Sequence, residues 1–484
     1  MSEAQIIDRL RSRLPDSCVL HEAEDLRPYE CDGLSAYRQL PLAVVIPETI
    51  EQVRTLLEVC NEHAVPVVAR GAGTGLSGGA LPLAGGVLLS MARFNRILDI
   101  DTANRVARVQ PGVTNLSITK AAQPHGLYYA PDPSSQIACS IGGNVAENAG
   151  GVHCLKYGLT THNIQALEVL TMAGEHMTIG ATSLDSPGYD LLALLTGSEG
   201  LLGVITEVTV KLLPIPETAR VVMASFASVD AAGAAVTAVI ASGIIPAGLE
   251  LLDHPAIQAV ERFIDAGYPA DARAILLCEL DGSTVDVDEQ IGHVQQVFTE
   301  AGATELKVSR DEAERQRFWA GRKAAFPAMG RLSPDYYCMD GTIPRKHLAR
   351  VLNEIGKLSD EYGLPICNVF HAGDGNLHPL ILYDANTPGE LERTEELGGR
   401  ILEACVAVGG TITGEHGVGM EKINQMCVQF NSGELEQFHR VKAAFDPAGL
   451  LNPGKAIPTL HRCAEFGAMH VHKGQLPHPE LERF

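Results

Sequence analysis

The sequence predicts an α+β protein with two domains, the first built around glycine-rich loops and the second around a ferredoxin-like sheet. Three observations support this prediction. The chain has 484 residues, which is too long for a single hydrophobic core. A β-α-β pattern near the N-terminus leads directly into glycine-rich loops. Past Pro214 and Pro216 the composition changes, and strands and helices alternate without such loops.

The first domain is expected to begin after a polar, partly helical extension at residues 1–34. Residues 42–46 are a short apolar run typical of a buried strand. A helix is expected to follow from residue 47, with Thr49 as its N-cap ahead of the apolar positions. Residues 65–69 form a second apolar run, which completes the β-α-β pattern.

The loop at residues 70–79 contains the pattern Gly-x-Gly-x-x-Gly at 73–78. A Rossmann motif requires a helix that begins within the glycines. Here Pro82 and two further glycines follow at once, without helical periodicity, and no lysine follows as in a Walker motif. A long loop with many free N–H groups can still bind an anion such as pyrophosphate. A plain glycine-rich turn is the alternative, and this loop by itself does not decide between them.

Two further loops share this character. Residues 131–151 are small, polar and nearly uncharged, and residues 196–206 are a glycine turn that runs into an apolar strand continuing to residue 213. Such segments lack the apolar side chains of a hydrophobic core, and their backbone can wrap around a ligand. Three of them within about 150 residues indicate a large, extended ligand.

The second domain, from residue 215, is expected to contain two successive β-α-β units. The predicted strands are residues 221–226, 247–252, 274–280 and 303–308, and the predicted helices are residues 228–242 and 285–300. This order suggests a ferredoxin-like sheet with its helices on one face. Residues 231–249 carry no charge, but Gly243 and Pro246 interrupt them, so we expect a soluble helix and a strand rather than a membrane span.

Two glycine-framed segments carry the residues most suited to chemistry. The sequence HAGDGNLH spans His371 to His378, and TGEHGVG at 413–419 contains Glu415 and His416. Imidazoles and a carboxylate can hold a divalent metal, and a histidine beside that metal can move a proton. The alternative is that these are turn residues with incidental histidines.

Composition limits the possible partners. The formal net charge of −22 argues against nucleic acid and anionic lipid. The 11 cysteines include no Cys-x-x-Cys pair, which argues against iron–sulfur and zinc-finger sites. The first ten residues mix acidic and basic side chains and contain no apolar segment typical of a secretory signal. We therefore expect a cytoplasmic protein.

Taken in order, these motifs resemble the FAD-linked D-2-hydroxy-acid dehydrogenase branch of the vanillyl-alcohol-oxidase/PCMH superfamily, and in particular its glycolate-oxidising, flavin-carrying subunits. The motifs are the glycine loop at 70–79, PDPSS, GGN and NAGG within 131–151, TGSEGLLGVIT at 196–206, HAGDGNLH, TGEHGVG, and FDPAGLLNPGK at 445–455. The resemblance covers about residues 35–458. It implies a PCMH-type FAD-binding domain at 35–214 and an FAD-linked oxidase C-terminal domain, which caps the flavin, at 215–458.

The resemblance also implies which residues hold the flavin. The loop at 70–79 would hold the pyrophosphate, residues of 131–151 would line the flavin and ribityl path, and Ile205 would meet the adenine side. The expected cofactor residues are Arg70, Gly71, Ala72, Gly73, Thr74, Gly75, Ser77, Gly78, Gly79, Pro131, Ser134, Ser135, Gly142, Gly143, Asn144, Asn148, Gly150, Gly200, Ile205 and Asn452. Some members attach FAD covalently to a histidine in the glycine loop. This loop has Thr74 and Gly75 and no histidine, so non-covalent FAD is expected.

For the chemistry, the resemblance implies zinc or manganese on His371, His378 and Glu415, with His416 as the catalytic base. An imidazole with an ordinary pKa would already titrate near working pH. Arg322 is the expected carboxylate anchor, because a guanidinium suits a carboxylate; the alternative is that Arg322 and Lys323 are solvated helix residues. Asp340 is interpreted as structural, since Asp-Gly is common in turns.

The expected substrate is a small 2-hydroxy monocarboxylate, either glycolate or D-lactate. Relatives that oxidise 2-hydroxyglutarate carry a threonine and a lysine where this chain has Phe326 and Cys338. His153 and His162 are expected either to lie near the flavin or to hydrogen-bond only to the backbone.

The expected partners are a companion flavoprotein-like subunit and an iron–sulfur subunit, to which the tail at 459–484 would dock. Attachment to the inner membrane would then run through those subunits, without a membrane span in this chain. Two alternative functions stay open: a stand-alone D-lactate dehydrogenase, and a flavin-bearing scaffold subunit without its own chemistry.

Overall fold

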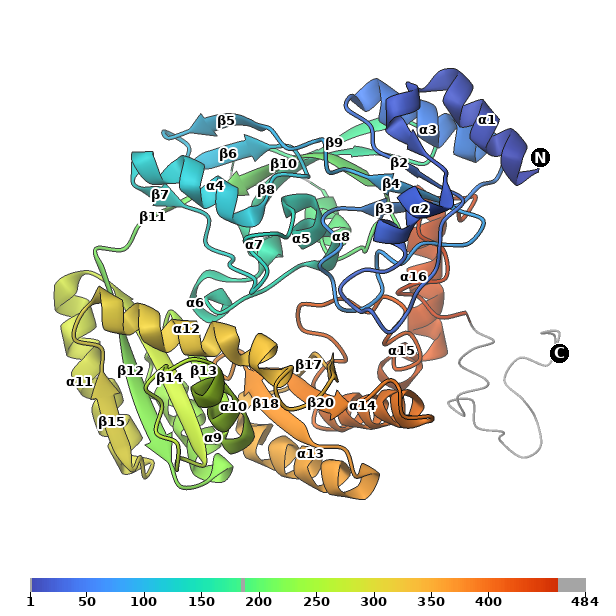
Figure 1. The fold of residues 1–484 in the computed structure, drawn as a ribbon. Helices are drawn as coiled ribbons and strands as arrows, with labels where there is room; N and C mark the ends of the chain where they lie inside the picture. The colour runs from blue at the N-terminus through green and yellow to red at the C-terminus, as the bar shows by residue number, and fades with distance from the viewer. Residues whose placement is uncertain (1, 184–187, 460–484) are drawn as a thin grey trace.

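The computed structural model describes residues 2–183 and 188–459. The chain forms two domains that face each other, with the N-terminal domain at the top of Figure 1 and the C-terminal domain at the bottom. The expected change of character at residue 215 corresponds to the connection from β11 (Leu213–Pro214) to β12 (Thr218–Phe226). The expected docking tail at 459–484 lies, apart from Thr459, outside the described residues.

The N-terminal domain contains the predicted β-α-β pattern. Its first sheet has the order β1-β2-β4-β3, in which β2 and β3 both pair in parallel with β4. The strands are β1 (Val19–Leu20), β2 (Ala43–Val45), β3 (Val67–Arg70) and β4 (Val87–Ser90). Helix α3 (Ile50–Glu62) begins after Thr49, whose side chain accepts from the Gln52 N–H, so the predicted cap is confirmed. Helix α1 (Glu3–Arg13) buries Ile6 and Leu10 in the same core as α3, which makes the expected extension part of this domain.

A second, antiparallel sheet has the order β5-β6-β10-β8-β9. Its strands are β5 (Ile97–Asp101), β6 (Val106–Val109), β8 (Ile164–Leu170), β9 (His176–Gly180) and β10 (Val204–Lys211); β7 (Leu127–Tyr128) pairs with β11. Short helices lie between this sheet and the C-terminal domain (Figure 1). They include α5 (Ile141–Glu147), α6 (Cys154–Tyr157) and α7 (Thr160–Asn163); α4 (Asn115–Ala122) and α8 (Leu191–Leu195) also belong to this domain. The loop predicted at 131–151 therefore contains one short helix, α5, which buries Ile141 and Val145 against the sheet.

The C-terminal domain is built on a seven-stranded antiparallel sheet of order β15-β12-β14-β13-β18-β20-β16. The predicted strands are confirmed as β12, β13 (Gly248–Asp253), β14 (Ala274–Gly282) and β15 (Glu305–Val308), and the predicted helices as α9 (Val229–Ala241) and α11 (Thr284–Glu300). The remaining strands are β16 (Asp335–Cys338), β18 (Ile366–Phe370) and β20 (Pro379–Tyr383), with β17 (Gly341–Thr342) paired to β19 (Asn376–Leu377) beside them.

Helices cover both faces of this sheet, so the expectation of one covered face is wrong. Helices α9, α11, α13 (Leu348–Tyr362) and α14 (Glu390–Ala407) pack on the face that carries Ala224 and Leu276. Helices α10 (His254–Phe263) and α12 (Glu312–Met329) pack on the face that carries Met223 and Leu277. The strands are apolar on both faces, which requires cover on both. Helix α12 lies between the sheet and the N-terminal domain (Figure 1).

The chain finally returns to the N-terminal domain. After α15 (Met426–Gln429) and α16 (Ser432–Phe445), the Val67 N–H donates to the Leu450 carbonyl (2.8 Å), and the Asn452 N–H donates to the Val67 carbonyl (2.8 Å). Leu450 and Leu451 are buried in the core formed by α1, α3 and the first sheet. The closing motif therefore packs with the N-terminal domain, although the sequence places it at the end of the second.

Candidate active site

The three glycine-rich loops predicted from the sequence converge on one cavity of about 430 Å³ between the two domains. The predicted cofactor residues that line it are Arg70, Gly71, Ala72, Gly73, Thr74, Gly75, Gly79, Ser134, Ser135, Gly142, Gly143, Asn144, Gly200 and Ile205. The C-terminal domain contributes Lys323, Phe326 and Pro327 from α12, and His378, Glu415 and His416. A volume of this size is typical of a cofactor or small-molecule site.

The glycine loop needs glycine at particular positions. Gly73 has a φ of 70°, which side-chain-bearing residues rarely adopt. A Cβ on Gly71 would overlap Ser140 Oγ, so this position lets the first loop approach the N-cap of α5 closely. The loop is not helical, in agreement with the rejection of a Rossmann motif. Its exposed backbone forms one wall of the cavity, as an anion-binding loop requires.

Some predicted cofactor residues support the cavity from outside its lining: Ser77, Gly78, Pro131, Asn148, Gly150 and Asn452. The Ser77 hydroxyl donates to the His416 carbonyl (2.9 Å) and ties the glycine loop to the second domain. The Asn452 amide donates to the carbonyls of Gly79 (3.0 Å) and Glu199 (2.7 Å). These two side chains position the glycine loop from behind.

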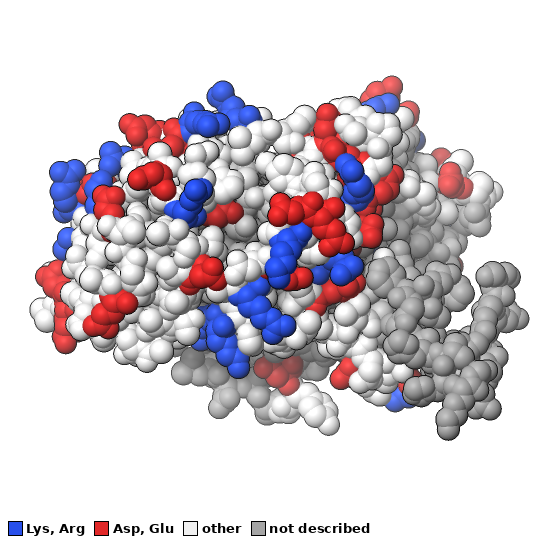
Figure 2. Space-filling view, turned by 90° about the horizontal axis from the view of Figure 1, so that it is seen from below, with Lys and Arg blue, Asp and Glu red and all other residues white. Residues whose placement is uncertain are grey.

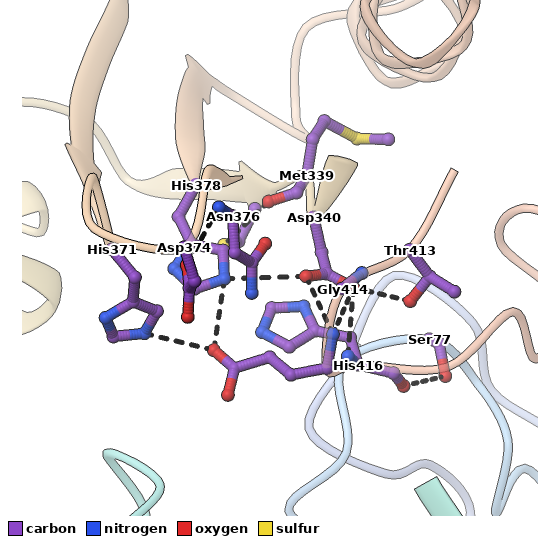
Figure 3. A network of polar contacts seen from close by, with 12 residues as sticks. Ser77, Met339, Asp340, His371, Asp374, Asn376, His378, Thr413, Gly414 and His416 are labelled. Carbon is purple, nitrogen blue, oxygen red and sulfur yellow. Dashed lines mark hydrogen bonds and ion pairs between the residues drawn. The ribbon is translucent and has the colours of Figure 1, made fainter. Parts of the chain in front are cut away.

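His371, His378 and Glu415 come together at one end of the cavity (Figure 3). The Nε2 atoms of both histidines lie 3.2 Å from Glu415 Oε1. Ligand atoms about 2.0–2.1 Å from a tetrahedral zinc lie roughly 3.3 Å from one another, so this spacing fits a shared metal. Among the described residues, the buried His378 Nε2 also approaches Asp340 Oδ1 (3.6 Å), but neither carboxylate contact has hydrogen-bond geometry, which leaves its lone pair available.

Asp340, His378 and His416 form a second group with metal-ligand spacing. Asp340, however, is fully buried and already satisfied. Its carboxylate accepts from the Thr413 hydroxyl (2.6 Å), from the backbone N–H groups of Gly414 (3.0 Å) and His416 (2.9 Å), and from Lys422 Nζ (3.1 Å). Asp340 thus holds the loop that carries Glu415 and His416 in place, which confirms its interpretation as structural.

Electrostatics separates the roles of these groups. Burial lowers the pKa of His416 to about 4, and the nearby His378 and Lys422 contribute to this shift. The ring is therefore neutral at pH 7 and can accept a proton. The expected ordinary pKa is therefore wrong. Burial would raise the pKa of Glu415, but His371 and His378 outweigh it and hold that pKa well below the usual range. The ring of His416 stacks on that of His378 with centroids 5.0 Å apart.

Comparison with known proteins decides the family. The family model described as "FAD binding domain" matches residues 41–180, and the model "FAD linked oxidases, C-terminal domain" matches residues 215–456. The chain belongs to the FAD-linked oxidases. Glycolate oxidase subunit GlcD of Escherichia coli (strain K12) is 67% identical to this oxidase over 484 residues, which is 100% of this chain and 97% of that protein.

Two further relatives share less of the sequence. Glycolate oxidase subunit GlcD of Bacillus subtilis is 40% identical over 428 residues (88% of this chain, 91% of that protein), and D-lactate dehydrogenase of Anaerostipes hadrus is 33% identical over 461 residues (93% and 97%). Among solved structures, 4-ethylphenol oxidase from Gulosibacter chungangensis and p-cresol methylhydroxylase each share the fold with a TM-score of 0.79 at 18% identity, covering 94% of this chain and 97% of theirs. These structures confirm the predicted PCMH-type architecture.

In this FAD-linked oxidase, Arg322 is a buried residue of α12, so the alternative that Arg322 is a solvated helix residue is wrong. Its side chain is 2% exposed, and its Nε donates to Glu250 Oε2 (2.7 Å). Glu250 Oε1 lies 2.8 Å from His371 Nδ1. Arg322 lies outside the cavity lining, but its Nη2 is buried without a partner in the described part of the chain. Lys323, on the same helix, is exposed and lines the cavity.

Glu250 is a candidate site residue that the sequence interpretation missed. It is the one carboxylate among the apolar residues 247–252, and a charge at such a position is a signal for a buried partner. Because it bonds to His371 Nδ1, it directs His371 Nε2 toward Glu415. A carboxylate behind a histidine ligand fixes the ring and raises its basicity.

For the metal expected on His371, His378 and Glu415, replacing Glu250 with glutamine is predicted to weaken binding about 10–100-fold, because the His371 ring would lose its anionic partner. Titration of the metal-depleted holoenzyme with zinc or manganese, followed by elemental analysis, measures this effect. Glu354→Gln, on the exposed side of α13, is the matched control. Unchanged metal affinity in Glu250→Gln would contradict the assigned role.

Proposed function

We propose that this oxidase catalyses the FAD-dependent oxidation of a small 2-hydroxy monocarboxylate, with glycolate to glyoxylate as the first candidate and D-lactate to pyruvate as the second. The observation that carries the proposal is the cluster of His371, His378 and Glu415 beside the neutral His416, at the end of the cavity formed by the FAD-binding loops. The names of the relatives support it, since they include glycolate oxidase subunits and a D-lactate dehydrogenase.

The residues of the cluster have separable tasks. His371, His378 and Glu415 would hold zinc or manganese, which would polarise the hydroxyl and carboxylate oxygens of the substrate when bound. His416 would accept the hydroxyl proton, because its ring lines the cavity and is neutral at pH 7. With FAD present, the Cα hydrogen would leave with its electron pair to the isoalloxazine ring. Arg322 is the proposed carboxylate anchor because its buried Nη2 has no partner in the described part of the chain, although the residue lies outside the cavity lining and its Nε is paired with Glu250.

The cavity supports non-covalent FAD. The glycine loop offers backbone N–H groups and no histidine to which a flavin could be attached, and residues 142–144 begin α5, whose N-terminus faces the same space. Phe326 lines the cavity and stacks edge-on against Tyr336 with ring centroids 6.1 Å apart. That bulk favours a small substrate. Cys338 is buried and lies outside the lining.

Electrons would leave to a partner subunit or to quinone. The name of the Escherichia coli relative describes a subunit, which supports companion subunits, flavoprotein-like and iron–sulfur in type. Within residues 2–183 and 188–459, no helix is both long and apolar enough to cross a membrane. Acidic and basic side chains lie interspersed over much of the face in Figure 2, in keeping with the proposal that nucleic acid is not a partner. We propose a cytoplasmic location, with inner-membrane contact through partners as the alternative.

A scaffold subunit without chemistry is the alternative from another class, and D-lactate dehydrogenase acting alone is the alternative among enzymes. Bringing four ionisable groups together, two of them buried, costs stability, and a scaffold has no physical need for that cost, so the intact cluster favours an enzyme.

The deciding experiment follows the flavin spectrum of the purified protein without oxygen. We expect glycolate, or D-lactate, to bleach the oxidised flavin band rapidly, and a chelator to prevent this until zinc or manganese is restored. The acid that bleaches the band faster identifies the substrate. A flavin band that neither acid reduces would favour the scaffold, and bleaching that resists complete metal removal would contradict the metal's role.

A further inference from the structure

His153 sits where the two domains meet, between one carboxylate from each. It lies at the N-cap of α6, in the N-terminal domain. Its Nδ1 is 2.8 Å from Asp132 Oδ2, in the loop that forms a wall of the flavin cavity, and its Nε2 is 2.9 Å from Glu279 Oε1, on β14 of the C-terminal domain. The mechanism proposed above does not use this histidine.

The number of N–H groups that the imidazole ring must donate determines the charge of His153. A neutral imidazole has one N–H donor and one acceptor nitrogen, whereas ionised aspartate and glutamate only accept. Two carboxylates can therefore be satisfied only by an imidazolium, which donates from both nitrogens. Glu279 is ionised, because its other oxygen accepts from Arg315 Nη1 (2.7 Å) and from the Trp319 indole N–H.

We propose that His153 is a protonated positioning residue that fastens the flavin-cavity loop at 131–135 to the C-terminal domain. Asp132 is followed directly by Pro133, Ser134 and Ser135, which line the cavity. The two N-terminal segments pack closely, since a Cβ on Gly151 would lie 2.5 Å from the Asp132 carbonyl oxygen. His153 thereby holds a wall of the cofactor site in register with the domain that carries the catalytic cluster.

A second contact runs beside the first. On the same face of β14, two residues beyond Glu279, Asp281 accepts from the Tyr157 hydroxyl (2.6 Å) and is paired with Lys156. The side chains from 153–157 thus bind adjacent carboxylates of one strand. This second contact contains no histidine, so the imidazole of the domain contact is that of His153.

The charge makes the contact sensitive to alkali. Burial by itself would lower the pKa of His153, but Asp132 and Glu279 outweigh it and raise that pKa well above its ordinary value of about 6.5. The stabilisation is complete below about pH 6.5 and is lost as the pH rises through the higher value of the folded protein. Further charged groups at this contact are Arg315 and its partner Glu312. His153 is 25% exposed and lines a cavity of about 470 Å³ at the domain boundary, so its proton can exchange with solvent. The same cavity is also lined by Glu217, Arg220, Asp281, Arg310 and Asp311.

Two substitutions in the holoenzyme test the proposal: His153→Gln, which retains one hydrogen bond without charge, and His153→Arg, which retains a permanent cation. FAD release on dilution is measured by flavin fluorescence from pH 6 to 10, together with the emission of Trp319, the only tryptophan of the chain and a member of the same network. His254→Gln is the matched control, because His254 Nδ1 bonds to a single carbonyl, that of Ala272 (2.8 Å).

At pH 7 we expect His153→Gln to raise the dissociation constant of FAD about tenfold or more, since a hydrogen bond to a charged group contributes roughly that factor. The wild type should release FAD more readily above the His153 titration, with a change in Trp319 emission at the same pH. His153→Arg should bind FAD within about twofold of the wild type at pH 7 and show no such alkaline transition. The proposal is overturned if the His153→Gln variant binds FAD as tightly as the wild type, or if the His153→Arg variant keeps the alkaline transition of the wild type. FAD release needs no substrate, so this result is independent of which acid is oxidised.

Discussion

Replacing His416 with alanine is expected to slow reduction of the bound flavin by glycolate or D-lactate about 10²–10⁴-fold, the usual contribution of a positioned general base. His416 is half-buried, lines the cavity and has its pKa lowered to about 4, so at pH 7 its ring can accept the hydroxyl proton. Anaerobic stopped-flow measurement at saturating substrate isolates this step from product release and from reoxidation.

Two controls separate chemistry from structure in this experiment. His439→Ala removes a histidine of α16 whose hydrogen bond in the described part of the chain is to the Pro458 carbonyl (2.9 Å), and this variant should reduce flavin at the wild-type rate. Metal and FAD contents of His416→Ala should equal those of the wild type, since His371, His378 and Glu415 keep their contacts. A loss of only a few-fold, or a loss that parallels metal release, would remove His416 from the role of base.

Replacing Asp340 with asparagine is expected to lower the free energy of unfolding by about 3–5 kcal/mol, the typical effect of removing one partner from a buried ion pair. Lys422 and Asp340 are both fully buried, and burial would raise the pKa of Asp340 if Lys422 and His416 did not lower it well below the usual range. The asparagine NH₂ group also cannot accept the N–H groups that Asp340 binds in the loop at 413–416.

A double-mutant cycle distinguishes the ion pair from a general loss of packing. Asp340→Asn combined with Lys422→Met removes both charges and should be more stable than the sum of the two single effects. Denaturant unfolding of the four proteins measures the coupling, and Asp286→Asn, at the exposed start of α11, is the matched control. Additive effects would show that Asp340 and Lys422 stabilise the loop independently.

Local patterns in the sequence were sufficient for much of the fold. The cap at Thr49 and the strands and helices of both β-α-β units are encoded by neighbouring residues, through capping and apolar periodicity. The rejection of a Rossmann helix at 70–79 rested on the same kind of local evidence. The convergence of the three loops, and of His371, His378, Glu415 and His416, was expected from motifs and the family resemblance.

The tertiary structure decided the properties that depend on partners far away in the chain. Glu250 reaches His371 across 121 residues, Glu279 reaches His153 across 126, and the closing motif returns from residue 450 to Val67. The pKa values of His416 and His153 shift in opposite directions, because burial dominates at His416, whereas the carboxylates of Asp132 and Glu279 outweigh burial at His153. A residue type specifies which proton can move, but burial and neighbouring charges determine whether it is bound, and only the packed chain supplies those.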